Sequence, residues 1–211
     1  MSTNRRLPKT PLALAVLSLL LEEPMHPYEM KARMQERGHD QVIKIKGASV
    51  YDTVERLNRL GFIQPVETNR EGRRPERTIY SLTDAGREEL LAWLRELISR
   101  PVHEYPQFAA ALAFMVGVGS HKEVISLLEW RIAALEAQIA TSDKLLRHTV
   151  DHSIPRIFLI EEEYAQAIRQ AEVGFVRGLI ADLEAGGLWP DAATLEALAA
   201  RQRERRGGRE V

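Results

Sequence analysis

The chain has 211 residues, no cysteine and a formal net charge of −1. Its length allows one large domain or two small ones, and a hydrophobic content of 45% supports a buried core. The lack of cysteine excludes disulfides, cysteine nucleophiles and thiolate metal sites. Residues 1–100 carry a net charge of +3 and residues 101–211 a net charge of −4, a small asymmetry that fits a nucleic-acid reader joined to an interaction module.

The N-terminal part predicts two helices and a linker. Thr10 is a suitable N-cap and Pro11 a suitable first residue for a helix that is apolar nearly all round, which places it in the centre of the core. A second helix is predicted from about Tyr28 to Arg37, and residues 39–46 are predicted as a linker with a short extended piece at 42–45. Because no apolar run approaches the roughly 18–20 residues of a membrane span, we expect a cytoplasmic protein that is not associated with a membrane.

Residues 47–82 carry the most informative pattern. A helix is predicted over about 48–60, with an apolar stripe on one face and Gly61 at its end. Two strands are predicted at about 62–67 and 77–82, and Asn69 and Gly72 supply the turn between them. Four arginines lie at the tip of this hairpin: Arg70, Arg73, Arg74 and Arg77. A helix followed by a basic hairpin is typical of a winged helix-turn-helix.

The rest of the chain is predicted to be helical. Thr83 is expected to cap a fourth helix, and a break with two prolines places a domain boundary near residue 101. Beyond it we expect a short helix over 107–116 and long helices over about 120–149 and 155–185, with coiled-coil-like apolar seams. The prediction is thus a mainly α chain with a winged helix-turn-helix in 10–100, a helical domain in 101–187 and a partly disordered tail in 188–211.

Several segments together resemble the PadR family of bacterial transcriptional regulators. They are HPYEM (26–30), GASVY (47–51), ERLNRLGFI (55–63), EGRRPERTIYSLT (71–83) and DAGREEL (84–90). EYPQFAAALAF (104–114) and PRIFLIEEEYAQAIRQAE (155–172) resemble the virulence-activator-type C-terminal domain of the longer members. The resemblance implies a homodimeric repressor that binds an inverted-repeat operator in double-stranded DNA and responds to a small molecule.

The expected DNA-binding residues lie on the third helix, on the linker before it and on the wing. If Val50, Val54 and Leu57 face inward, the charged residues Asp52, Glu55, Arg56 and Arg59 face outward. The full set is Lys44, Lys46, Ser49, Tyr51, Arg56, Arg59, Arg70, Arg73, Arg74 and Arg77. In the alternative interpretation the helix face is solvated, with Asp52–Arg56 and Glu55–Arg59 pairs, and the wing is a solubilising loop. A second alternative is a winged-helix protein–protein adaptor that does not bind DNA.

The back half is expected to form the dimer and to contribute to an effector site. The expected interface residues are Leu128, Leu135, Ile139, Phe158, Tyr164 and Phe175. Trp93, Tyr105, Phe108 and Trp130 are flat side chains that could line a pocket for a small hydrophobic or aromatic effector, the alternative being that they belong to the core.

Enzymatic and metal functions find little support in the sequence. His148 and His152 are four residues apart, but no third ligand is evident, so we expect no metal and no cofactor. Glu161, Glu162 and Glu163 point in three directions on a helix, which favours a solvated face over an acid/base pair. Because no nucleophile motif or phosphate loop stands out, we do not expect an enzyme.

Overall fold

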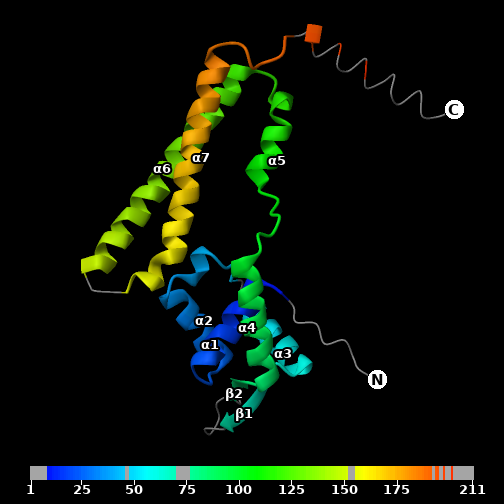
Figure 1. The fold of residues 1–211 in the computed structure, drawn as a ribbon, viewed down its shortest axis with the longest axis vertical. Helices are drawn as coiled ribbons and strands as arrows, with labels where there is room; N and C mark the ends of the chain where they lie inside the picture. Colours follow the sequence, from blue (N-terminus) through cyan, green and yellow to red (C-terminus); the bar gives the residue numbers. More distant parts are fainter. Residues whose placement is uncertain are drawn as a thin grey trace, which may run out of the picture. The chain divides into compact units, whose positions relative to one another are not determined.

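The computed structural model describes residues 9–45, 48–69, 77–151 and 155–191, together with residues 193, 194, 197 and 201. The chain divides into two compact units, Met1–Glu104 and Tyr105–Val211. The described residues are mainly helical, with one two-stranded antiparallel sheet in the first unit and long helices in the second (Figure 1). The predicted fold class is therefore confirmed.

The first unit has the element order of a winged helix. Its elements are α1 (Pro11–Glu22), α2 (Pro27–Glu36), η1 (His39–Gln41), α3 (Ser49–Leu60), β1 (Ile63–Asn69), β2 (Arg77–Leu82) and α4 (Asp84–Ser99). The prediction of an extended piece at residues 42–45 is wrong. The backbone N–H groups of Val42 and Ile43 both donate to the carbonyl of His39, at 3.2 and 2.8 Å, so local turn bonds replace strand pairing there.

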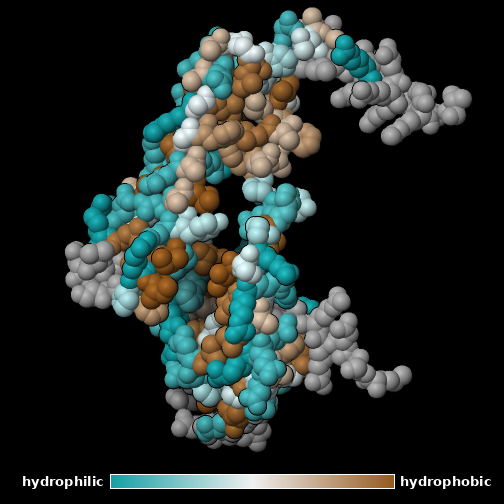
Figure 2. Space-filling view, in the orientation of Figure 1, coloured by the Kyte–Doolittle hydropathy of each residue, from teal (hydrophilic) through white to brown (hydrophobic). Residues whose placement is uncertain are grey.

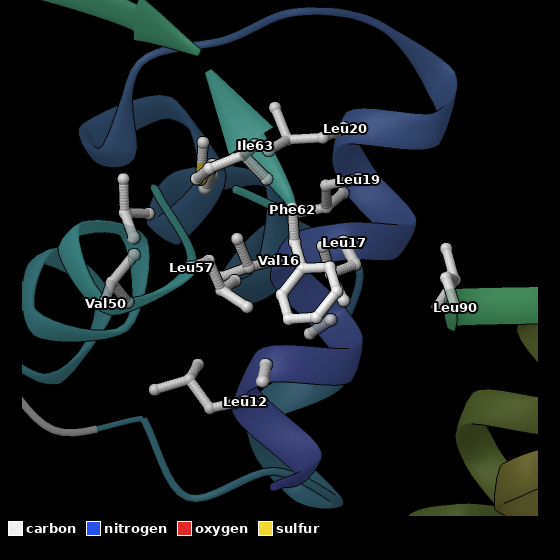
Figure 3. Close-up of a cluster of buried hydrophobic side chains, with 14 of the residues drawn as sticks. Leu12, Val16, Leu17, Leu19, Leu20, Val50, Leu57, Phe62, Ile63 and Leu90 are labelled. Carbon is white, nitrogen blue, oxygen red and sulfur yellow. The ribbon is translucent and has the colours of Figure 1, made fainter. Parts of the chain in front are cut away.

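The core of the first unit is built around α1, as its sequence predicts. Thr10 caps this helix by accepting a hydrogen bond from the backbone of Ala13, and Pro11 occupies the first turn. Figure 3 shows the α1 side chains packed against Val50 and Leu57 of α3, Phe62 and Ile63 at the start of the wing, and Leu90 of α4. The α1 residues buried in this cluster are Leu12, Ala13, Ala15, Val16, Leu17, Leu19 and Leu20.

The wing is a short hairpin with one irregularity. Ile63 pairs with Leu82 and Asn69 with Arg77, and the register shifts between Pro65 and Glu67. Because a proline cannot donate to a ladder, a bulge beside Pro65 on a two-stranded sheet is where such a residue is tolerated.

The second unit contains α-helices and short 3₁₀ segments. These are α5 (Gln107–Ala113), η2 (Met115–Val118), α6 (His121–Asp151), η3 (Arg156–Leu159) and α7 (Ile160–Glu184). Two predicted bounds are corrected. The helix predicted over 107–116 ends as an α-helix at Ala113, and the backbone of Phe114 donates to Ala111 in a tighter turn. The helix predicted from Pro155 starts with a 3₁₀ turn and becomes α-helical at Ile160.

The long helices α6 and α7 form an antiparallel hairpin with its own small core. Val124 and Leu128 of α6 are buried with Val176 and Leu183 of α7. Further hydrophobic residues, which are partly buried, pack against these four: Phe108, Met115, Ile125, Ile132, Leu179, Ile180 and Trp189.

A polar cluster crosses the same hairpin. Ser142, which is only 4% exposed, donates to the carboxylate of Glu162, and Arg169 donates to both groups at 2.8 and 2.9 Å. Burial acts to raise the pKa of Glu162, but the hydrogen bonds from Ser142 and Arg169 and the charge of Arg169 outweigh it, so the pKa is lowered. The expectation that residues 161–163 form a solvated face is thus wrong for Glu162, since its partners lie in the hairpin.

Candidate nucleic-acid interface

Helix α3 presents a charged face to solvent. Val50, Val54 and Leu57 are buried in the core of the first unit, which fixes the rotation of the helix about its axis. The opposite face carries the exposed side chains of Tyr51, Asp52, Glu55, Arg56 and Arg59. Gly61, with a φ of 78°, ends the helix in the left-handed conformation that glycine adopts most easily.

The charged residues of this face are not tied to one another. In the part of the chain that the structure describes, no ion pair joins Asp52 to Arg56 or Glu55 to Arg59. The intrahelical pairs of the alternative interpretation are therefore not formed. Ser49, at the start of the helix, is half-buried, and its carbonyl accepts a hydrogen bond of 2.6 Å from the hydroxyl of Thr53.

Other predicted DNA-binding residues flank α3. Lys44 is exposed just before the helix. Arg77 is the first residue of β2, but its side chain is not described. Lys46, Arg70, Arg73 and Arg74 lie outside the described residues.

Thr83 joins the end of α3, the wing and α4. Its hydroxyl lies 2.8 Å from the carbonyl oxygen of Gly61 and 2.9 Å from that of Phe62, and it accepts a hydrogen bond from the backbone of Gly86 at 3.1 Å. The predicted cap of α4 is confirmed. The same side chain fixes the start of the wing relative to the end of α3.

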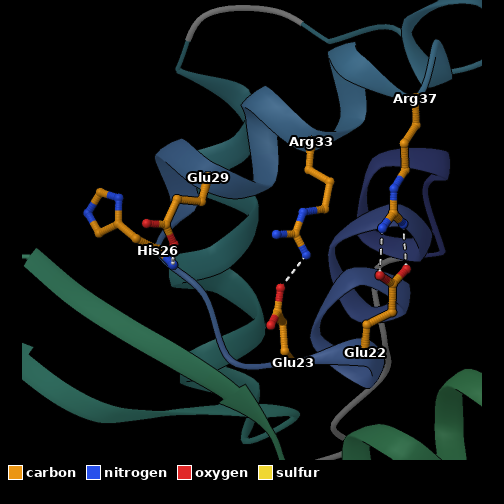
Figure 4. Close-up of polar contacts among 6 residues, drawn as sticks. All are labelled: Glu22, Glu23, His26, Glu29, Arg33 and Arg37. Carbon is orange, nitrogen blue, oxygen red and sulfur yellow. Dashed lines mark hydrogen bonds and ion pairs between the residues drawn. The ribbon is translucent and has the colours of Figure 1, made fainter.

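Helix α2 is fastened to the end of α1 by two ion pairs (Figure 4). Arg37 donates two parallel hydrogen bonds to Glu22, at 2.5 and 2.7 Å, and Arg33 pairs with Glu23. The hydrogen bonds from Arg37 lower the pKa of Glu22 and raise that of Arg37. These pairs were not predicted, because the partners are 10 and 15 residues apart in the sequence and nothing in a local pattern links them.

His26 is the N-cap of α2, which begins at Pro27, one residue before the start predicted from the sequence. Its Nδ1 accepts a hydrogen bond of 3.1 Å from the backbone of Tyr28, and Glu29 accepts one of 3.1 Å from the backbone of His26. The spacing of a capping residue and a glutamate three positions later is the signal that could have revealed this cap. The His26 ring also makes an edge contact with Tyr51 of α3, with 6.3 Å between ring centroids.

The four residues considered for an effector site have different surroundings. Trp93 is 4% exposed and belongs to the core of the first unit. Phe108 is half-buried in the second unit, where the guanidinium of Arg131 lies 3.6 Å above the ring centroid. Tyr105 and Trp130 are 87% and 74% exposed.

The residues considered for a dimer interface fall into two groups. Leu128 and Leu135 are buried, and Ile139 is half-buried, within the second unit of a single chain. Phe158, Tyr164 and Phe175 are exposed. Figure 2 shows hydrophobic surface beside the upper part of α7.

Two further features concern metals and membranes. Among the described residues there is no group of three or more His, Asp or Glu side chains that could hold a metal ion. The side chains of His148 and His152 lie outside the described part. None of the described helices has both the length and the hydropathy that a bilayer crossing needs.

A helix that packs on a three-helix core and is followed by a two-stranded wing defines a winged helix-turn-helix fold. Residues 16–92 match the model of the Transcriptional regulator PadR-like family. The resemblance seen in the sequence is therefore confirmed by the match over residues 16–92. No curated protein matches the sequence.

Solved structures extend the likeness into the second unit. PadR of Bacillus subtilis in complex with operator DNA has 22% identity and a TM-score of 0.64. The same protein in complex with p-coumaric acid has 20% identity and a TM-score of 0.67, and the Vibrio cholerae virulence activator AphA has 18% and 0.62. Each likeness covers 82% of this chain and 98% of the other. At these identities the likeness shows a shared fold.

Proposed function

We propose that the protein is a DNA-binding transcriptional regulator that inserts α3 into a major groove. The observation that carries this proposal is the exposed face of α3, where two arginines and two acids stand without ion pairs to one another beside a wing. A recognition helix reads bases with side chains that are not already engaged on its own surface. The family of residues 16–92 and the operator complex of the Bacillus subtilis protein support the same function.

The basic, hydroxyl and acidic residues of the α3 face have different roles in this proposal. Arg56 and Arg59 donate to guanine edges or to phosphates, and Ser49 and Tyr51 contact phosphates at the start of the helix. Asp52 and Glu55 accept hydrogen bonds from cytosine amino groups. Where no cytosine is present, their repulsion of the DNA phosphates is not compensated, so both residues contribute to sequence specificity.

The wing adds sequence-independent affinity. The eight residues that run from the end of β1 to the first residue of β2 contain four arginines: Arg70, Arg73, Arg74 and Arg77. Each arginine that neutralises a phosphate releases counterions and steepens the salt dependence of binding. An arginine at the tip also suits a narrow minor groove. Lys44 and Lys46 add positive charge just before α3.

A homodimer through the second unit would place two such helices on an inverted repeat. The support is a row of exposed apolar side chains along η3 and α7: Ile157, Phe158, Ile160, Tyr164, Ile168 and Phe175. From Ile160 to Phe175 the positions follow one another at steps of four, four and seven residues, which keeps them on one side of the helix. Leu128 and Leu135 are already buried in one chain, so the partner in this proposal meets the α7 row and not these two residues.

The finer steps of the proposal are repression and release by a small hydrophobic or aromatic effector. The support is the p-coumaric acid complex of the Bacillus subtilis relative. An effector can act only by binding one arrangement of the dimer better than the other, and the affinity for DNA then falls by the same coupling factor. Tyr105, Phe108 and Trp130 remain candidates for its contacts, whereas Trp93 is a core residue.

The test of the proposed function is selection of binding sites from a pool of random duplexes with the full chain. We expect enrichment of an inverted repeat whose half-sites are about one or two helical turns apart. A pool that stays random after several rounds would contradict sequence-specific binding.

A protein–protein adaptor with the same fold is the competing function, and the wing distinguishes the two. In a DNA-binding protein, replacing Arg73 and Arg74 by alanine lowers affinity for all duplexes, and the salt slope becomes shallower by about 0.9 for each phosphate that is no longer neutralised. In an adaptor, neither quantity depends on the wing.

A further inference from the structure

The segment Met25–Glu29 meets three elements of the winged helix within five residues. Met25 exchanges two backbone hydrogen bonds with Tyr80 of β2, at 3.1 and 3.2 Å. The next residue, His26, caps α2 with its side chain and touches Tyr51 of α3 with its ring. Figure 4 shows Glu29 reaching back to the backbone nitrogen of His26, which closes the cap. The His26 ring is thus held by the cap hydrogen bond to its Nδ1, and its backbone is held by Glu29, where the ring meets α3.

The contact between His26 and Tyr51 has a defined geometry. The two rings meet edge to face, with an interplanar angle of 75° and 6.3 Å between centroids. Nδ1 of His26 is occupied as the acceptor of the Tyr28 N–H, so the imidazole cannot rotate without losing the cap. A fixed ring of this kind can favour one rotamer of an adjacent tyrosine roughly two- to tenfold.

Tyr51 is partly exposed, so a fixed neighbour can decide which rotamer it adopts. It lies in the first turn of α3, its side chain is 42% exposed, and it stands on the same face as Asp52 and Arg56. An exposed tyrosine in a helix has two accessible χ1 rotamers, and only one of them directs the hydroxyl to a given phosphate. Ordering that side chain before DNA arrives reduces the entropy lost on binding.

We propose that His26 is a positioning residue for DNA binding, which holds Tyr51 in the rotamer that contacts the DNA backbone. The inference rests on the proposed function and deepens it. The backbone hydrogen bonds between Met25 and Tyr80 connect the residue next to His26 to the wing. Tyr51 is thereby coupled to the wing, so that the start of α3 and the wing act as one DNA-binding surface. His26 itself touches no DNA in this account and acts through Tyr51.

The test separates the ring of His26 from its capping role. His26→Asn keeps a strong N-cap acceptor and removes the imidazole, whereas His26→Ala removes both. We expect His26→Asn to melt close to the wild type and yet to bind a selected duplex about three- to tenfold more weakly. In a Tyr51→Phe background, where the hydroxyl is absent, the same change is expected to have little further effect. His26→Ser is the second cap-keeping variant should the asparagine variant fail to fold.

A measurement without DNA tests the contact itself. The chain has five tyrosines, so selective labelling gives five ring signals by NMR. We expect the Tyr51 signal to shift in His26→Asn and the Tyr164 signal, from the second unit, to stay in place. An unchanged Tyr51 signal, or cap-keeping variants that bind DNA as tightly as the wild type, would overturn the positioning role. Failure of the wild type to bind any duplex would instead overturn the proposed function, and this inference with it.

Discussion

Gly86 of α4 lies against the carbonyl oxygen of Phe62, so closely that a Cβ at position 86 would stand 2.0 Å from that oxygen. Because the obstacle is backbone, a larger residue must displace α4 from the start of the wing. We predict that Gly86→Ala lowers the free energy of unfolding by roughly 2–3 kcal/mol, although alanine favours helix by about 1 kcal/mol. Urea denaturation followed by circular dichroism measures the change.

Gly174→Ala is the matched control for this prediction. Gly174 is also helical, but a Cβ there would meet nothing within 4 Å. We expect this variant to be as stable as the wild type or more stable by up to about 1 kcal/mol. Equal effects at the two glycines would contradict the close approach at Phe62.

The Glu22–Arg37 pair predicts a pH dependence of stability. The pKa of Glu22 is lowered in the folded chain, so the pair stabilises above the ordinary value of 4.5 and its contribution is lost as the pH falls through the lowered pKa. Side chains about two-fifths exposed (44% and 40%) are screened by solvent, which keeps the contribution below about 1 kcal/mol. In urea denaturation at about pH 6, Glu22→Gln is therefore expected to have a lower free energy of unfolding than the wild type. In acid the two free energies are expected to converge.

Glu88→Gln provides the comparison, since it removes the same charge from an exposed position on α4. The difference in the free energy of unfolding between Glu88→Gln and the wild type is expected to stay small across the same pH range. If Glu22→Gln kept a constant offset down to acid pH, the ion pair would not be the source of the effect.

Arg56 is predicted to carry sequence discrimination. Its exposed position on α3 lets the guanidinium fork onto a guanine, and removing that interaction costs about 1–3 kcal/mol and relaxes the preference at that base pair. Fluorescence anisotropy of Arg56→Ala with a selected duplex and single-base variants measures both effects. Arg95→Ala removes the same charge from α4 and is expected to bind nearly as the wild type does. Equal effects in both variants would mean that Arg56 acts only through net charge.

The exposed apolar row of α7 predicts the oligomeric state. Ile168 is 51% exposed in the middle of this row, and a charge there would be buried in the proposed interface. We expect Ile168→Glu to be a folded monomer by light scattering where the wild type is a dimer. Gln170→Glu, which adds the same charge at an exposed position outside the row, is expected to remain dimeric. A dimer in both variants would place the interface elsewhere.

The helices of the first unit could be predicted from the sequence because the caps and apolar stripes that define them are local patterns. Thr10 and Thr83 cap the helices that they were expected to cap, and the stripe of Val50, Val54 and Leu57 is the buried side of α3. Each of these features depends on residues within one or two helical turns. The fold class and the resemblance to the PadR-like family followed from several such signals in the correct order.

The remaining features depend on residues that are distant in the sequence. The apolar spacing of α7 did not reveal that Val173 and Val176 are the residues buried within the single chain while Tyr164 and Phe175 are exposed, because both sets satisfy helical periodicity. The pairing of Glu162 with Ser142 depends on how two long helices align. The contact of His26 with Tyr51 joins residues 25 positions apart through the packing of α2 on α3.

The measurement that most directly tests DNA recognition by α3 is fluorescence anisotropy of the full chain with DNA from immediately upstream of its own gene. A scrambled duplex of the same composition is titrated in parallel, and both are repeated at several salt concentrations. The account predicts saturable binding at two chains per site, much tighter than to the scrambled duplex, with affinity that falls steeply as salt rises. Weak binding that is equal on both duplexes, together with a failed selection from random DNA, would contradict it.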